Sequence, residues 1–88
     1  MEINTANSNN TVFALRYTYQ ERDSYITGTW GLYWSLPRAR KILRETMATL
    51  RDNGYQCTID SPNSELVCMY RLYDNREYHL YIEKMEIE

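Results

Sequence analysis

The sequence predicts an α+β fold: a two-layer sandwich in which one amphipathic helix lies across an antiparallel sheet of about five strands, in the order ββαβββ. Several segments alternate apolar and polar residues with period two, which is typical of half-buried strands. One segment, near residues 36–52, instead repeats apolar residues at three- and four-residue spacing. The length of 88 residues allows one domain with one modest core.

Residues 1–10 are polar and rich in Asn, Ser and Thr, so we expect a flexible arm followed by a single α+β domain over residues 11–88. The arm lacks the basic start and apolar run of a signal peptide, and no segment approaches the apolar length of a membrane span. These features predict a cytoplasmic protein with no membrane partner.

The first two strands are expected on either side of the turn Q-E-R-D-S. In the first, Phe13, Leu15, Tyr17 and Tyr19 share one face. In the second, alternation places Ile26, Gly28, Trp30, Leu32 and Trp34 on one face, and predicts that the two tryptophans and Leu32 are core residues. Gly28 and Gly31 would weaken this strand unless a bulge or a side chain lying across the backbone needs the space.

The helix is expected to begin after Ser35, a plausible N-cap, with Leu36-Pro37 in its first turn. Asn53-Gly54 supplies a stop signal. The apolar stripe consists of Ala39, Ile42, Leu43, Met47 and Leu50, with Arg40, Arg44 and Arg51 along one border.

Three further strands are expected at Tyr55 to Asp60, Glu65 to Tyr73 and Tyr78 to Ile87. A two-residue hairpin tip at Pro62-Asn63 would place Cys57 opposite Cys68, Tyr55 opposite Tyr70 and Ile59 opposite Leu66, all on one face. A turn of another length would shift this register and exchange the faces. The cysteines are expected to be buried thiols, with a disulfide as the alternative.

Nine tyrosines make the chain rich in side chains that combine a large apolar area with a polar tip. Alternation predicts Tyr17, Tyr55, Tyr70 and Trp30 on the helix-facing side. Tyr25, Tyr33, Tyr73 and Tyr81 have the opposite phase, so several should lie on the open face of the sheet. Because tyrosine is enriched in interface hot spots, these four are candidate partner-binding residues.

The net charge of −2 predicts no general attraction to nucleic acid or anionic membranes. Charge is nevertheless uneven: the helix carries a local +3, and residues 53–88 carry −4. Arg38, Arg40, Lys41 and Arg44 are therefore candidates for binding a phosphate backbone or an acidic protein surface. The alternative is an ordinary solvated helix face.

Signals for catalysis and metal binding are sparse. His79 is the single histidine, so a metal set made with Cys57 and Cys68 would be incomplete. The acids Glu77, Glu83, Glu86 and Glu88 are interpreted as a solvated strand face, and no phosphate-binding glycine motif is present. We therefore expect a protein without enzymatic activity, metal or cofactor.

The strand I-T-G-T-W-G-L-Y-W-S, the Leu36-Pro37 helix start, Ala39 and the closing Y-H-L-Y-I-E-K-M-E-I resemble small uncharacterised domains common in phages and mobile elements. Some phage proteins of this size resemble stoichiometric inhibitors of host defence enzymes, including anti-CRISPR proteins, which cover a nucleic-acid channel or an assembly surface. The resemblance implies no catalytic residues. It implies the host cell cytoplasm as the location if the chain is phage-encoded.

The leading hypothesis is a non-enzymatic protein-binding module, of the phage-inhibitor type, whose partner is a nuclease or effector subunit of a bacterial defence complex. Its contact surface would combine the sheet-face tyrosines with either the acidic C-terminal strand, as a mimic of phosphate charge, or the basic edge of the helix. One alternative is a small nucleic-acid-binding protein that uses the basic helix and aromatic stacking. Another is a homo-oligomeric structural protein, a homodimer for example, in which the tyrosine face is buried against a second copy.

Overall fold

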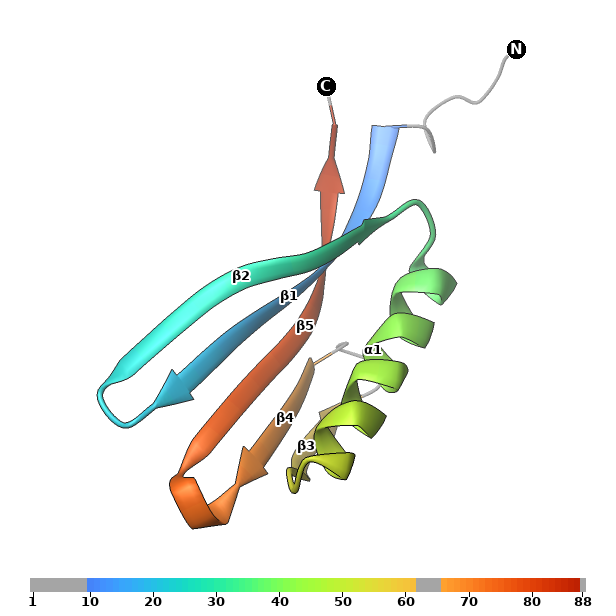
Figure 1. Ribbon diagram of the computed structural model, residues 1–88. Helices are drawn as coiled ribbons and strands as arrows, with labels where there is room; N and C mark the ends of the chain where they lie inside the picture. Colours follow the sequence, from blue (N-terminus) through green and yellow to red (C-terminus); the bar gives the residue numbers. More distant parts are fainter. Residues whose placement is uncertain (1–9, 62–65, 88) are drawn as a thin grey trace.

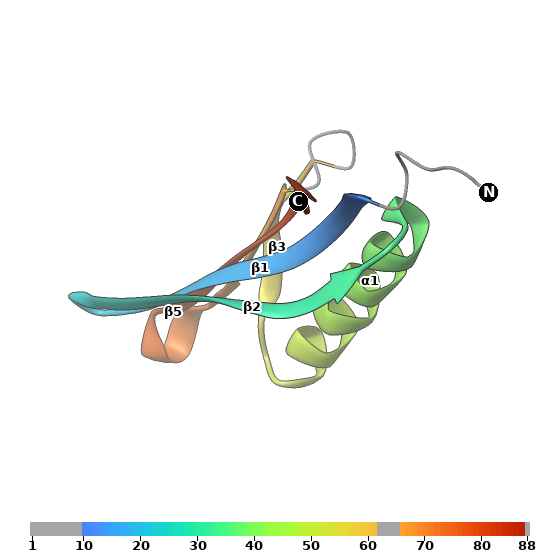
Figure 2. The same cartoon turned by 90° about the horizontal axis from the view of Figure 1, so that it is seen from above.

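The computed structural model describes residues 10–61 and 66–87, and it has the predicted ββαβββ order. Five antiparallel strands form one sheet in the order β2-β1-β5-β4-β3, and α1 lies across one face (Figure 1). Seen from above, sheet and helix form two layers (Figure 2). The elements are β1 (Thr11–Glu21), β2 (Ser24–Tyr33), α1 (Leu36–Asp52), β3 (Gln56–Ser61), β4 (Leu66–Arg71), the short 3-10 helix η2 (Leu72–Asp74) and β5 (Arg76–Glu86).

Two predictions fall on chain segments that are not described: the flexible arm, except for residue 10, and the Pro62-Asn63 hairpin tip. The last two strands differ modestly from their predicted bounds. The chain leaves β4 at Arg71 and makes one 3-10 turn, and β5 then begins at Arg76. Asn75 takes the left-handed conformation that closes this turn (φ 55°), as Asn tolerates better than most residues.

The helix begins and ends at its predicted residues. The backbone N–H of Arg38 donates a 3.3 Å hydrogen bond to Oγ of Ser35, which is the N-cap. Pro37 lies in the first turn, where its missing N–H costs no hydrogen bond. Gly54 follows the C-cap with φ 92°, a conformation that favours glycine.

The core lies between α1 and the sheet. Alternate residues of each strand point toward the helix, and the helix places one stripe of apolar residues against them. Its most deeply buried side chains come from three strands and the helix: Leu15 of β1, Leu43 and Met47 of α1, Val67 and Met69 of β4, and Leu80 of β5.

A β-bulge in β2 overturns the prediction that both tryptophans and Leu32 are core residues. Leu15 pairs with Gly31 but Arg16 pairs with Thr29, so Trp30 is the extra residue and alternation reverses there. Leu32 pairs with Ala14 on the face away from α1 and is 61% exposed. Trp34 follows the strand and is 67% exposed, whereas Trp30 stays on the helix side and is 41% exposed.

The predicted hairpin register of β3 and β4 is also wrong. Cys57 pairs with Met69, and a bulge then shifts the register so that Ile59 pairs with Cys68. Cys57 packs against the helix-side core, while Cys68 lies on the opposite face of the sheet. The two cysteines are not joined in a disulfide.

Candidate partner-binding surface

The two edges of the sheet, β3 and β2, differ in how well they resist pairing with another chain. Strand β3 has six residues, a bulge, and a charged residue in Asp60. Asp60 accepts a 2.8 Å hydrogen bond from the guanidinium of Arg44, and this interaction lowers the pKa of the carboxyl. A short, bulged and charged edge is the usual protection against edge-to-edge pairing.

Strand β2 has ten residues, Ser24–Tyr33, and contains neither a charge nor a proline. Its bulge is the one protective device that it shares with β3. Large apolar side chains emerge from both faces of this edge. Ile26 and Trp30 are exposed on the helix side, and Tyr25 and Leu32 on the other side. Strand β2 therefore offers unpaired backbone groups together with apolar surface above and below them.

An apolar groove runs between β2 and α1, on the helix side of this edge. Its volume is about 320 Å³. The lining residues are Trp30 and Tyr33 of β2, and Ile42, Thr46, Thr49 and Leu50 of α1. The hydroxyls of Thr46 and Thr49 donate to helix carbonyls four residues earlier, so the polar atoms of these two residues already have partners.

The wall of the groove at Trp30 is held by an aromatic cluster on the helix side. Trp30 stacks on Tyr17 with ring centroids 4.6 Å apart, and lies 5.7 Å from Tyr78. Tyr55 extends the cluster through Tyr78 at 5.4 Å. Burial raises the pKa of both Tyr55 and Tyr78, so these phenols stay neutral at physiological pH. The indole of Trp30 therefore packs against uncharged aromatic rings.

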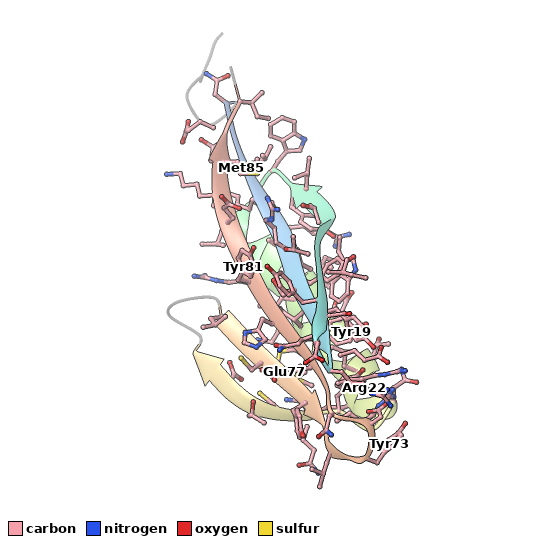
Figure 3. All side chains as sticks on the ribbon, turned by 90° about the vertical axis from the view of Figure 1, so that its left-hand side faces the viewer. Tyr19, Arg22, Tyr73, Glu77, Tyr81 and Met85 are labelled. Atoms are coloured by element: carbon pink, nitrogen blue, oxygen red, sulfur yellow. The ribbon has the colours of Figure 1, made fainter. Side chains whose placement is uncertain are left out.

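The four candidate tyrosines do not form one surface. Tyr25 and Tyr81 lie on the open face of the sheet, as predicted, and Figure 3 shows Tyr81 on the side away from α1. Tyr73 is 78% exposed but lies in η2, where its ring packs 4.8 Å from the guanidinium carbon of Arg71. The open-face prediction is wrong for Tyr33, whose ring packs against the core on the helix side.

The three tyrosines predicted on the helix-facing side have different outcomes. Tyr17 and Tyr55 lie on the helix side as expected. Tyr70 does not, because the corrected register places it opposite Glu77, where its hydroxyl donates a 2.6 Å hydrogen bond to Asn75.

The candidate basic residues are all exposed on α1. Arg44 pairs with Asp60 of β3, at the edge of the sheet opposite to β2. At 100° per residue, Arg40 lies near Arg44 on this border, whereas Arg38 and Lys41 lie on the solvent side. The basic side chains therefore do not gather beside the exposed aromatic residues of β2.

The comparisons with known proteins give no relative. No family model matches the chain, and no curated protein or solved structure is significantly similar to it. Among residues 10–61 and 66–87, no helix has the length and apolar content needed to cross a membrane.

Sequence reasoning missed the edge strand and its groove. The composition of Ser24–Tyr33 carried a usable signal, since ten residues without charge or proline are unusual for a strand at a sheet edge. The alternation of apolar and polar residues indicates which side chains share a face of a strand, but not which strands lie side by side. It therefore could not place β2 at the edge of the sheet.

Proposed function

We propose that this chain is a non-enzymatic protein-binding module that docks an extended segment of another protein on the edge of β2. The observation that carries the proposal is the contrast between the two edges, since β3 is short and charged while β2 is long, uncharged and apolar. The natural complement of an open edge is another strand, which supplies main-chain hydrogen bonds.

The groove beside β2 favours a specific kind of partner. A strand added to β2 would direct alternate side chains to the helix side, toward Trp30, Ile42 and Leu50. The side chains between them would cover Tyr25 and Leu32 on the other face. The partner segment is therefore an uncharged strand that has apolar side chains on both of its faces.

A stoichiometric inhibitor of a bacterial defence complex, acting in the host cytoplasm, is the form of this function that we propose to test first. Its basis is the resemblance to phage domains together with the protein-binding surface. An inhibitor of this kind needs no active site, because it acts by occupying a surface that its target requires.

The test is affinity capture from nuclease-treated bacterial lysate at physiological salt, with variants that place one lysine on each edge. Thr29→Lys puts a charge on β2, and Gln56→Lys is the matched control on β3. Both native residues are exposed. We expect the wild type and Gln56→Lys to retain a single protein in equal amounts. Thr29→Lys should retain at least tenfold less of it.

Equal retention by the two lysine variants would refute docking on β2. Hydrogen exchange gives an independent check, because amides of β2 that face solvent in the free chain should become protected in the complex. Protection confined to α1 would instead favour the basic helix as the binding element.

The nucleic-acid alternative has weaker support, because Arg44 is engaged by Asp60 and no exposed aromatic residue of β2 lies beside the basic border. Its expected signature is an affinity that falls steeply with salt. The homo-oligomeric alternative predicts a molecular mass that rises with protein concentration and is restored to the monomer value by Thr29→Lys.

A further inference from the structure

A cluster of three potential metal ligands lies on the open face of the sheet, away from β2 and its groove. Cys68 of β4 and His79 of β5 are directly paired cross-strand neighbours. Glu77 precedes His79 by two residues and therefore shares its face, and Figure 3 shows Glu77 on the side away from α1. One ligand atom from each of the three residues lies within 4.8 Å of the other two.

The two nitrogens of His79 have different partners. Nδ1 lies 3.6 Å from Sγ of Cys68, and Nε2 is in close contact with a carboxylate oxygen of Glu77. The carboxylate of Glu77 favours the tautomer of His79 in which Nε2 carries the proton. The lone pair of Nδ1 then points toward Cys68, as a metal ligand requires.

The separation of sulfur and nitrogen suits a tetrahedral ion. Zinc binds thiolate sulfur at about 2.3 Å and imidazole nitrogen at about 2.0 to 2.1 Å, and two such ligands at the tetrahedral angle lie about 3.6 Å apart. The Sγ to Nδ1 distance in the structure is 3.6 Å. The pair would therefore need little rearrangement to chelate an ion placed on the solvent side.

The surroundings allow the site to be reached. Cys68 is only 3% exposed, but the side chains of His79 and Glu77 are 41% and 33% exposed. Burial and the nearby charge of Glu77 raise the pKa of the Cys68 thiol. A cation bound at the sulfur would displace the thiol proton to solvent.

We propose that Cys68 and His79 bind a divalent cation of the zinc class through Sγ and Nδ1, with Glu77 orienting the imidazole from Nε2. Water or groups of a partner protein would fill the two remaining positions of a tetrahedral ion. A carboxylate that holds the second nitrogen of a histidine ligand strengthens metal binding, and its loss typically costs 10- to 100-fold in affinity. The proposal does not depend on docking at β2.

From the sequence, His79 with the two cysteines was an incomplete metal set, Glu77 was interpreted as part of a solvated strand face, and the expected register paired Cys68 with Cys57. The observed register moves Cys57 to the helix side and brings Cys68 against His79. Cys57 thus serves as an internal control, since it is a thiol of the same chain on the other face of the sheet.

The test is titration of the reduced, full-length chain with Co²⁺, followed by displacement with Zn²⁺. We expect one Co²⁺ per chain and a thiolate-to-cobalt charge-transfer band in the near ultraviolet. The band should persist in Cys57→Ser and be lost in Cys68→Ser. Glu77→Gln should weaken binding by about 10- to 100-fold.

His79→Gln keeps the test decisive if the buried Cys68 does not tolerate serine, because His79 is half-exposed and its replacement should leave the fold intact. The proposal would be overturned by a folded wild type that shows no charge-transfer band with Co²⁺. A band that survives His79→Gln, or one that disappears in Cys57→Ser, would overturn it as well.

Discussion

The phenol ring of Tyr17 lies across the backbone of Gly28, its cross-strand partner in β2. A methyl group at residue 28 would meet the ring and hydroxyl of Tyr17 at 2.8 to 3.0 Å, which is closer than such contacts allow. The ring cannot easily move away, because it also stacks on Trp30 and lies against Tyr78. A side chain lying across the backbone is one of the two reasons that the sequence suggested for a glycine here, and the bulge at Trp30 is the other.

We therefore expect Gly28→Ala to destabilise the fold by about 1–3 kcal/mol, the usual cost of overpacking. Urea denaturation measures this directly. Thr29→Ala is the control, since its native side chain is exposed and the change should stay within about 0.5 kcal/mol. In a Tyr17→Ala background the penalty should largely disappear, so an equal penalty in both backgrounds would contradict the proposed contact.

Two leucines test where the core ends. Leu80 is fully buried beneath α1 in the central strand, while Leu72 is 76% exposed in η2. Leu80→Ala should cost about 2–5 kcal/mol, because it removes buried methyl groups and leaves a cavity. Leu72→Ala should change the free energy of unfolding by less than about 0.5 kcal/mol. A similar loss of unfolding free energy in the two variants would mean that Leu72 is buried in solution, in contrast to its exposure in the structure.

The turn before β5 should contribute to stability in a pH-dependent way. Arg71 donates two hydrogen bonds, of 2.9 and 3.1 Å, that hold the pKa of the Asp74 carboxyl below its ordinary value, and Arg76 adds an ion pair at 3.1 Å. The pKa of Asp74 is lower in the folded state than in the unfolded state. Its contribution to stability is therefore complete when the pH is above the unfolded-state pKa of about 3.9, and it is lost as the pH falls through the folded-state pKa.

We expect Asp74→Asn to lower the urea midpoint near pH 6, and the difference from the wild type to shrink steadily below about pH 4. Glu45→Gln, which removes one carboxylate from the exposed face of α1, is the control for the loss of a single charge. A difference between Asp74→Asn and the wild type that stays constant down to pH 2 would remove the ion pair as its cause.

The N-cap of α1 offers a further test at the start of the helix. Ser35→Ala removes the oxygen that accepts from the N–H of Arg38, and should cost about 1 kcal/mol. Ser35→Asp should preserve the cap and add a favourable charge at the positive end of the helix. The measurement is helical circular dichroism during urea denaturation. If Ser35→Ala loses this signal at a lower urea concentration than the wild type and Ser35→Asp does not, the N-cap hydrogen bond is the origin of the lost stability.

The helix was predictable because its signals are local: a cap at Ser35, a proline in the first turn, a periodic apolar stripe and Asn53-Gly54 at the end. The strands were also found, but their faces were assigned by counting residues in twos. One extra residue at Trp30 and one near Thr58 broke that count, which moved Leu32 out of the core and separated Cys57 from Cys68.

Bulges are set by pairing between distant strands, so alternation along one strand does not reveal them. The glycines at 28 and 31 were the available sign of an irregular β2. For the candidate binding residues, the sequence separated exposed from buried correctly at Tyr25 and Tyr73, and failed at Tyr33, which follows the bulge.

The central position of β5 has a consequence for how the chain reaches its fold. The β1–β2 and β3–β4 hairpins are each local in sequence, yet they are joined in the sheet only through β5, whose pairs with β1 run from Glu21 with Arg76 to Thr11 with Glu86. On the ribosome β5 emerges after both hairpins, so until then the two have no strand between them and β1 has an unpaired inner edge. Pairings so distant in sequence are slow to form, and we expect nascent chains stalled before Arg76 to be cleaved rapidly by protease, whereas chains released after Glu86 resist it.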